Sequence, residues 1–472
     1  METTPGSRNM LGNVSPSVFV LLFLTTLIAG GIIFLIRYAV SRRSRSSLEQ
    51  DSSKILRQPS WSPAAAPLGF IPIPQEPPIF SHTLHNGRRI PLNKKRNKQV
   101  LLYPAHPWLT STLRGHTGII SDMSFSNNGR YLASCADDRT VLLWYTKDFT
   151  SKNRKSLRVN IEFDHATLLR WSPDGKAFII HKAMANTIEV YKIAKKSDGY
   201  LASATKALEF PRRHTEDVVG MDIASTGKYI ITCSTANDLI IWDLKGQPLA
   251  TVEMHLGSTH RARISPCGRF VAASGFTPEV NVWEVVFNKS GEFKQVMKAF
   301  DLAGHTSGVH DFAFSADTSR MATVSKDGTY RFYDIKIEFE KGEDPHLLMT
   351  GTWDNTTPAS LALSPNAEVL VIAHGSSISF YSTITGVLDT IIQDIFVEPI
   401  TCLAFDAMGE YILVAGDKHI KIFRNITGCR TTIESAKRKL EQRQTQATKE
   451  RLEKMIRDNK ELLEKMGEKC PE

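Results

Sequence analysis

Between Gly304 and Asp334 the chain shows three short runs in which apolar and polar positions alternate, and turn residues separate the runs. Val309–Phe314 form the first run, Met321–Ser325 form the second, and the third ends at Tyr333-Asp334. An alternation with period two, bounded by turn residues, is the pattern of a strand that is buried on one side. This stretch therefore predicts three antiparallel strands joined by tight turns.

The same pattern recurs along the chain and gives seven units in all. The residues that end the first strand of each unit are Phe125, Trp171, Ile223, Ile264, Phe314, Leu363 and Phe405. Successive units are 41 to 52 residues apart. Because one such unit cannot bury both of its faces alone, it needs a neighbour on each side. Seven units are enough to close a ring.

Short signatures mark the ends of these units. A Gly-His pair precedes the first strand at Gly115-His116 and at Gly304-His305, and Trp242-Asp243 ends a third strand. With the unit length, these pairs resemble the WD40 repeat, in which each repeat forms one blade of a β-propeller. The resemblance implies an all-β fold, a seven-bladed WD40 β-propeller that occupies residues 101–429.

A ring of this kind must also close. After Phe423 the last unit has no fourth strand, whereas Trp108–Leu113 read as a strand that belongs to no unit of its own. We expect Trp108–Leu113 to form the outer strand of the last blade, because this pairing removes an open sheet edge.

Ahead of the propeller lies an apolar segment, Val18–Ile36, with no charged residue in 19 positions. As a helix it would span about 28 Å, close to the thickness of a hydrocarbon core of about 30 Å. The run is longer than the apolar core of a signal peptide and no basic cluster precedes it, so we interpret it as a retained transmembrane helix. Four Arg between 37 and 45 place the C-terminal side in the cytosol and residues 1–17 in the lumen. The short span favours the thin membrane of the endoplasmic reticulum.

Residues 37–100 are rich in Pro, and we expect them to form a disordered basic linker. Twelve Lys/Arg and three Asp/Glu give this linker a charge of +9, which equals the net charge of the whole chain. Its C-terminal part contains a basic run that consists of Arg88, Arg89, Lys94, Lys95, Arg96 and Lys98. Contact with anionic lipid and contact with RNA both fit this run. The scarcity of stacking aromatics beside it favours contact without base reading.

Residues 430–472 combine many Lys and Glu with apolar residues at helical spacing. Thr431 and Glu434 have the spacing of a capping box, which predicts an amphipathic helix that begins here. A short coiled coil, a helix that lies on the propeller and a lone amphipathic helix all remain open.

Two units carry polar residues that could be mistaken for a catalytic triad. The two sets are His116, Ser134, Asp138 and Trp144 in one unit, and His305, Thr323, Asp327 and Tyr333 in another. A catalytic site is needed once, whereas these residues recur at equivalent positions, so we interpret them as buried hydrogen-bonded tetrads. The residues that replace Asp138 in three other units are Ala185, Ala236 and Gly375. We expect those three units to lack the full network.

No other pattern points to enzymatic chemistry. The six Cys lack the spacing of metal ligands, and we interpret them as reduced thiols of a cytosolic domain. Paired carboxylates and a phosphate-binding loop are also missing from the sequence. We therefore predict a protein without catalytic residues, cofactor or metal.

Three segments carry a more specific resemblance: DHATLLRWSPDGKAFII (164–180), SPCGRFVAASGFTPEVNVWEV (265–285) and VSKDGTYRFYD (324–334). Together with the N-terminal anchor they resemble the membrane-anchored WD40 proteins of the transducin beta-like family. The resemblance implies a single-pass protein of the endoplasmic reticulum whose cytosolic propeller is a non-enzymatic scaffold in stress signalling and translational control. Implied partners are proteins bound at the propeller faces, among them the stress-activated kinase of this membrane that phosphorylates an initiation factor.

A second function also fits the sequence. The basic run and the propeller loops could make the chain a membrane-tethered RNA-binding protein, in which RNA is held through its phosphates. Propellers present loop-built faces to other proteins, so a protein-interaction scaffold is the interpretation that we prefer.

Overall fold

The computed structural model describes residues 106–151, 154–197, 199–354 and 358–470. All of them belong to one compact unit that extends from Lys98 to Glu472. The predicted anchor Val18–Ile36, the linker 37–100 and its basic run lie outside the described residues. Of the helices that are described, none is both long enough and apolar enough to cross a membrane.

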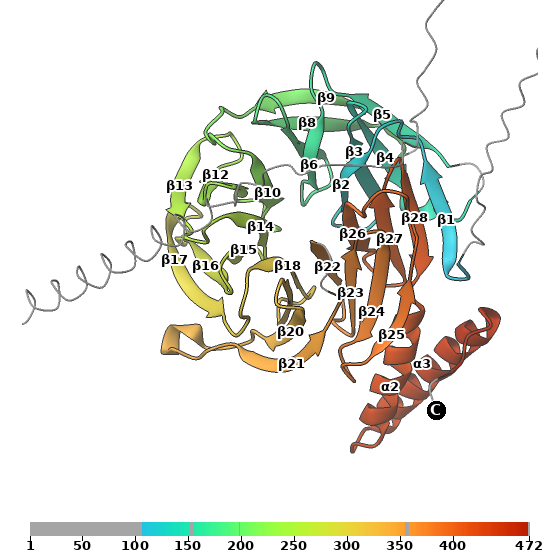
Figure 1. Ribbon diagram of the computed structural model, residues 1–472. Helices are drawn as coiled ribbons and strands as arrows, with labels where there is room; N and C mark the ends of the chain where they lie inside the picture. Colours follow the sequence, from blue (N-terminus) through green and yellow to red (C-terminus); the bar gives the residue numbers. More distant parts are fainter. Residues whose placement is uncertain (1–105, 152–153, 198, 355–357, 471–472) are drawn as a thin grey trace, which may run out of the picture. The chain divides into compact units, whose positions relative to one another are not determined.

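The described chain forms seven four-stranded antiparallel sheets arranged as the blades of a ring (Figure 1). With the innermost strand first, the blades are β2 (Ile120–Phe125), β3 (Tyr131–Ala136), β4 (Thr140–Tyr145), β5 (Ser156–Asn160); β6 (Ala166–Trp171), β7 (Ala177–Lys182), β8 (Thr187–Lys195), β9 (Leu201–Glu209); β10 (Val218–Ile223), β11 (Ile230–Ser234), β12 (Asp238–Trp242), β13 (Pro248–Glu253); β14 (Thr259–Ile264), β15 (Phe270–Gly275), β16 (Val280–Phe287), β17 (Phe293–Leu302); β18 (Val309–Phe314), β19 (Arg320–Ser325), β20 (Thr329–Asp334), β21 (His346–Thr352); β22 (Ala359–Leu363), β23 (Val369–His374), β24 (Ser377–Ser382), β25 (Leu388–Ile392); and β26 (Cys402–Phe405), β27 (Tyr411–Gly416), β28 (His419–Arg424), β1 (Leu109–Arg114). We number these blades 1 to 7. Short 3-10 helices follow β4 (η1, Thr146–Asp148) and β20 (η2, Phe339–Lys341).

All seven innermost strands end at the residues expected from the sequence, so the seven-bladed all-β fold is confirmed. The strands of a blade run antiparallel, which divides the connections between two faces. The turns between the second and third strands share one face with the connections to the next blade, and we call this the upper face. The turns between first and second strands lie on the opposite, lower face.

The ring closes as predicted. Strand β1 pairs antiparallel with β28, with Leu109 opposite Phe423 and Arg114 opposite His419. The first strand of the chain thereby completes the last blade. Trp108 and Leu113 are each only 2% exposed, so the closing strand contributes to the core as well as to the sheet.

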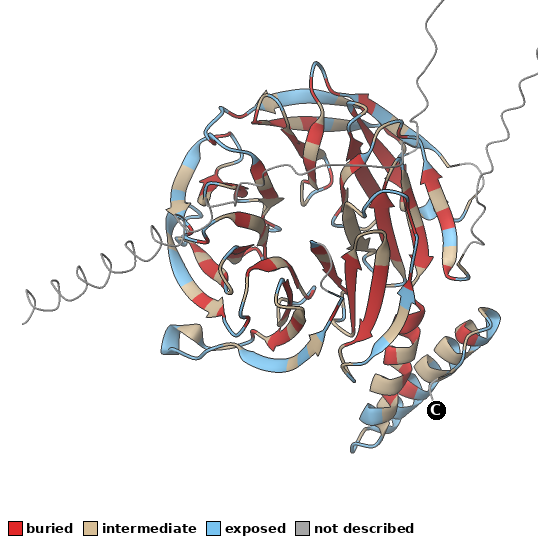
Figure 2. Ribbon diagram, viewed as in Figure 1, coloured by how far each residue is buried: buried red, intermediate tan, exposed pale blue. Residues whose placement is uncertain are grey.

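The core lies between neighbouring blades rather than at the centre of the ring. Strands β3 and β4 are buried at every position, whereas the outer strands β9 and β13 consist mostly of exposed and half-buried residues (Figure 2). One apolar cluster combines Leu142 of blade 1 with Leu413 and Ile422 of blade 7. Each sheet is therefore stabilised by burial against the next one, as sheet-on-sheet packing requires.

The C-terminal region differs from the expectation. It forms a hairpin of two helices, α2 (Ile426–Leu440) and α3 (Gln446–Lys465), instead of one helix that starts at Thr431. Asn425 directly follows β28 and caps α2, because its side-chain oxygen accepts the Gly428 N–H at 2.9 Å. Thr431 lies inside the helix, where its hydroxyl donates to the Gly428 carbonyl at 3.1 Å.

This hairpin is fixed to the ring closure. The Trp108 indole N–H donates to one Glu468 carboxylate oxygen at 2.6 Å, and Arg430 donates to the other at 2.7 Å. Arg430 also donates to both oxygens of Asp389 on β25 at 2.9 Å. The hairpin therefore packs on the propeller, as one of the three expectations had it, and connects blades 6 and 7.

The predicted tetrads lie inside blades 1 and 5. In blade 5, His305 Nε2 is 2.7 Å from the Thr323 hydroxyl and His305 Nδ1 is 3.0 Å from an oxygen of Asp327. Tyr333 donates instead to the Ala303 carbonyl at 3.0 Å. Burial alone would raise the pKa of Asp327, but hydrogen bonds from Thr329 and the Thr306 N–H lower it to about 2.

The tetrad of blade 1 has the same arrangement. His116 Nε2 is 2.8 Å from the Ser134 hydroxyl, and His116 Nδ1 is 3.2 Å from an oxygen of Asp138. The Trp144 indole N–H donates to the same hydroxyl at 3.0 Å. Burial lowers the pKa of His116, so its ring is neutral near pH 7. These four side chains satisfy one another within the blade.

Blade 3 overturns one expectation, because it has the full network despite Ala236. His214 Nδ1 is 2.6 Å from Asp238, its Nε2 is 2.7 Å from the Thr232 hydroxyl, and the Trp242 N–H donates to that hydroxyl at 2.8 Å. Asp238 is the first residue of β12, where blade 1 has Thr140. The Asp238 carboxylate, two residues after Ala236, thus contacts His214 in place of a carboxylate at position 236.

We expect His214→Ala and Asp238→Ala each to lower the free energy of unfolding by about 1–3 kcal/mol, because the remaining buried polar groups lose their partner. Urea unfolding of the full-length chain measures this change. His346→Ala is the matched control, because His346 on β21 is 60% exposed at its side chain. If Asp238→Ala unfolds like the parent chain, the carboxylate does not support blade 3.

Deletion of residues 101–112 should leave β28 with an unpaired edge and remove Trp108 from the core. Open edges pair with other chains, so we expect the product to be insoluble or dimeric, which size-exclusion chromatography detects. Deletion of twelve residues from 86 to 97 leaves β1 in place and serves as the control. Monomeric protein of normal stability after the first deletion would show that β1 is dispensable.

Candidate functional site

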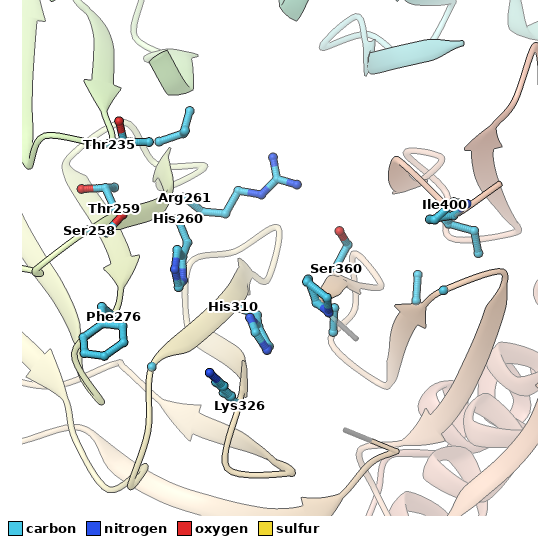
Figure 3. Close-up of a pocket in the computed structure, with 17 residues that line it drawn as sticks. Thr235, Ser258, Thr259, His260, Arg261, Phe276, His310, Lys326, Ser360 and Ile400 are labelled. Carbon is cyan, nitrogen blue, oxygen red and sulfur yellow. The ribbon is translucent and has the colours of Figure 1, made fainter. Parts of the chain in front are cut away.

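The most prominent hollow of the described residues is a cavity of about 1110 Å³ at the upper end of the central opening (Figure 3). We call it the channel mouth. The residues that line it come from the upper ends of blades 3 to 6 and from the connection that leads into blade 7: Val219, Thr235, Ser258, Thr259, His260, Arg261, Phe276, Gly308, His310, Lys326, Pro358, Ala359, Ser360, Ala373, Gly375, Pro399 and Ile400. Four blades and the connection that follows the last of them must therefore be in place before the cavity exists.

Nitrogen-bearing side chains are concentrated on one side of the channel mouth. His260 and Arg261 begin β14, His310 begins β18, and Lys326 follows β19. Figure 3 shows these four side chains between Phe276 on one side and Ile400 on the other. No Asp or Glu belongs to the residues that line this cavity. The mouth is therefore suited to an anionic group more than to a cation.

The two histidines are held in place by neighbouring groups. His260 Nδ1 is 2.8 Å from the Val309 carbonyl oxygen. Because a carbonyl oxygen only accepts, Nδ1 carries the hydrogen and Nε2 is not used by this bond. The His260 and His310 rings stack with centroids 6.1 Å apart. Burial lowers the pKa of His310, and the neighbouring His260 and Lys326 lower it further. His310 is therefore neutral near pH 7 until an anion approaches.

Exposed apolar side chains lie on the upper face, at the channel mouth and elsewhere on that face. Phe276 in the turn after β15 is 69% exposed, and Val397 in the connection before β26 is 93% exposed. Ile119, Phe163 and Met184 are further exposed apolar residues in upper-face turns and connections. Exposed apolar groups gathered around a hollow are typical of surfaces that bind other proteins.

Below the mouth, the opening contains ion pairs between blades. Arg170 of blade 2 contacts Asp122 of blade 1 through Nη1, and its Nε lies 3.7 Å from Asp222 of blade 3. Burial alone would lower the pKa of Arg170, but Asp122 and Asp222 raise it above its ordinary value. Burial raises the pKa of Asp222, and Arg170 opposes this effect. These charges neutralise one another inside the ring.

The aspartates of the channel also join consecutive blades through backbone groups. Asp122 accepts the Leu169 N–H, Asp222 accepts the Ile264 N–H and Asp311 accepts the Leu361 N–H, each at 2.9 Å. These bonds connect blades 1 and 2, blades 3 and 4, and blades 5 and 6. The smaller cavity of about 300 Å³ at this level is lined by these three Asp and by Arg170, Arg261 and Arg263, so its formal charges balance and Arg261 borders both cavities.

Of the predicted site residues that the structure describes, none lines the channel mouth. The two tetrads lie within blades 1 and 5, and the basic run Arg88–Lys98 is outside the described residues. Among the residues that the structure describes, no group of His, Cys, Asp and Glu is arranged to hold a metal ion. All six cysteines are free thiols.

Sequence reasoning missed His260, Arg261, His310 and Lys326. The available signal was the start of each innermost strand, because that end of the strand meets the opening on the upper face. His260 and His310 are the second residues of β14 and β18. The position of each residue within its repeat, combined with the geometry of the ring, would have been needed to predict that they lie close together.

Comparison with known proteins agrees with this architecture. The family model described as "WD domain, G-beta repeat" matches residues 108–145, 206–243, 295–334 and 394–424. The first match begins at Trp108 and the last ends at Arg424, which are the two ends of the closed ring.

Full-length relatives are also found. The chain is 44% identical to transducin beta-like protein 2 of Homo sapiens over 365 residues, which is 77% of this chain and 82% of the relative. It is 43% identical to transducin beta-like protein 2 of Mus musculus over 364 residues, with the same coverage. A guanine nucleotide-binding protein subunit beta of Arabidopsis thaliana is 23% identical over 331 residues, 66% of this chain and 82% of that protein. The repeats, the closed ring and the long alignment lead to one conclusion: the chain belongs to the transducin beta-like protein 2 family of WD40-repeat proteins.

Proposed function

We propose that this protein is a non-enzymatic scaffold that binds protein partners through the upper face of its propeller. The observation that carries the proposal is the channel mouth, a cavity of about 1110 Å³ with exposed Phe276 at its side and exposed Val397 nearby on the same face. A protein interface is expected to centre on desolvated apolar residues with polar groups around them. The upper face offers both.

The framework below this face supports the same function. The ring closure, the tetrads and the ion pairs of the channel hold the blades that carry these loops in fixed positions. A pre-organised surface loses less conformational entropy on association than a mobile one does. The propeller is thus a platform on which loops from distant parts of the sequence form one surface.

The cellular setting is part of the proposal and rests on the sequence. Val18–Ile36 would anchor the chain in the membrane of the endoplasmic reticulum, with the propeller in the cytosol. The family resemblance implies stress signalling and translational control, with the stress-activated kinase of that membrane as one partner. The basic run Arg88–Lys98 would lie between membrane and propeller, where it could contact anionic lipid.

RNA binding is the second candidate function, and the charge distribution favours it. The whole net charge of +9 resides in residues 37–100, so phosphates would be attracted to the linker more than to the propeller. Such binding would be weak, salt-dependent and without sequence preference, because it lacks a platform for base stacking.

A census of partners tests the scaffold. We expect the double variant Phe276→Ser, Val397→Ser to lose most proteins that copurify with the full-length chain, because it removes exposed apolar area from the upper face. Affinity purification with quantitative mass spectrometry measures the loss. The control is Leu244→Ser, Met408→Ser, which removes exposed apolar residues from lower-face turns.

Two arms separate the scaffold from the RNA-binding protein. Nuclease treatment should leave the copurifying proteins in place, and replacement of Arg88, Arg89, Lys94, Lys95, Arg96 and Lys98 by Ser should remove only bound RNA. Partners that vanish with nuclease but tolerate the upper-face variant would favour RNA binding as the main function.

Membrane orientation gives a separate prediction. Asn288 begins an Asn-Lys-Ser glycosylation motif, and its exposed side-chain oxygen accepts the Ser290 hydroxyl at 2.7 Å. If the propeller is cytosolic, Asn288 carries no glycan, and endoglycosidase treatment leaves the mass of the chain unchanged. As a control, replacing residues 1–36 by a secretory signal should create a mass shift that Asn288→Gln reduces by one glycan. A shift in the unaltered chain would contradict the orientation. Asn425 is unsuited to this test, because it is 3% exposed.

A further inference from the structure

Three nitrogen-bearing side chains form the inner part of the channel mouth. His260 and Arg261 are adjacent on β14, and His310 stacks beside His260 from β18. Figure 3 shows Arg261 extending from its strand into the opening, with the His260 and His310 rings beside it in the lining of the same cavity. All three are half-buried, so a ligand that reaches them is partly removed from water. Charge interactions are stronger there than on an open surface.

The Arg261 guanidinium has donors to spare. Among the described residues its one ionic neighbour is Asp311, at 4.0 Å from Nε, which is beyond hydrogen-bond length. Asp311 is already satisfied, because Arg263 donates to both of its oxygens at 2.9 and 3.0 Å. The Phe312 and Leu361 N–H groups each donate to Asp311 at 2.9 Å as well. Arg261 is therefore free to direct its planar donors at a carboxylate.

We propose that the channel mouth binds an acidic peptide segment of a protein partner, with a carboxylate at Arg261, His260 and His310 and a neighbouring large apolar side chain on Phe276. The inference rests on the proposed function and names the chemistry of the partner. Charge complementarity supports it, because the cavity is lined by four nitrogen-bearing side chains and by no carboxylate. The rest of the lining includes Pro358, Ala359, Ala373, Pro399 and Ile400, which suit the apolar part of a peptide.

A peptide fits this cavity better than a nucleic acid does. Phosphate backbones are recognised by extended tracks of Lys and Arg, whereas the mouth offers one compact cationic cluster within an apolar wall. Phe276 is the one Phe, Tyr or Trp among the described residues of that wall, so successive bases would lack a row of large aromatic rings to stack on. Arg-to-carboxylate pairing beside an apolar contact is instead a common way to recognise a side-chain sequence.

The test selects peptides on the purified full-length chain from a phage-displayed library of random linear peptides. We expect enrichment of sequences that place Asp or Glu next to Phe, Leu or Trp. An enriched peptide, synthesised with a fluorophore, should bind about tenfold more weakly when its Asp and Glu are replaced by Asn and Gln. Arg261→Gln, His310→Gln should weaken the acidic peptide by a similar factor.

The matched control is Arg130→Gln, His346→Gln, which removes one Arg and one His elsewhere. Arg130 is exposed at a lower-face turn and His346 is exposed on β21, so peptide binding should not change. Thermal melting of both double variants checks that they are folded.

Binding should also strengthen as the pH falls from about 7.5 to about 6, because a bound carboxylate favours the charged form of His310. The groups around His310 are His260, Lys326 and Asp311, with the Trp353 ring on a further side. His310→Gln should reduce the pH dependence.

The proposal is overturned if no peptides are enriched, if enriched peptides show no preference for Asp or Glu, or if they bind the Arg261, His310 variant as tightly as the parent chain. Binding of a single-stranded oligouridine at the mouth, lost in that variant, would also overturn it. A failure of the proposed function is recognised separately, because partners would then survive Phe276→Ser, Val397→Ser as well.

Discussion

The pairing of β1 with β28 is the interaction on which the rest of this structure depends. A blade has two apolar faces and can bury them only against two neighbours, so an open ring would expose a face at each end. The closing strand pairs residues that lie far apart in the sequence, from Leu109 with Phe423 to Arg114 with His419. They meet only because the intervening blades curve the chain back on itself.

The C-terminal hairpin reinforces that pairing. Glu468 receives hydrogen bonds from Trp108 and Arg430, so a residue near the end of the chain holds the residue that precedes the closing strand. Arg430 also contacts Asp389 of blade 6, and Ile426 and Ile433 of α2 are fully buried against the same cluster as Trp108. The hairpin is thus part of the propeller's core rather than a separate appendage.

Buried polar groups in the ring serve the framework, and their satisfaction explains why they recur. In blades 1, 3 and 5 a histidine bridges a hydroxyl and a carboxylate, and in the channel aspartates accept N–H groups of the next blade. A buried polar group without a partner is costly, so each of these sets is complete within itself. The channel mouth differs because Arg261 keeps donors that the framework does not use. That contrast separates a structural polar network from a surface prepared for a ligand.

The sequence by itself determined the number of blades, the ends of the innermost strands and the closing strand. These features depend on local alternation and on turn residues, which are readable along the chain. It also located the four bonded residues of blade 1 and His305, Thr323 and Asp327 of blade 5, because they repeat at fixed spacing, whereas Tyr333 bonds the Ala303 carbonyl. The structure was needed to identify Asp238, which lies two residues after the expected position. Only the path of the turn shows that its carboxylate contacts His214. The structure was needed for the start of α2 as well, where Asn425 and not Thr431 provides the cap.

Above all, the tertiary structure determined which residues form the channel mouth. His260 and His310 are 50 residues apart, and nothing in either repeat marks them as neighbours. They meet because consecutive blades place the starts of their innermost strands around one opening, and a position in such a ring is set by packing between blades, not by the local sequence.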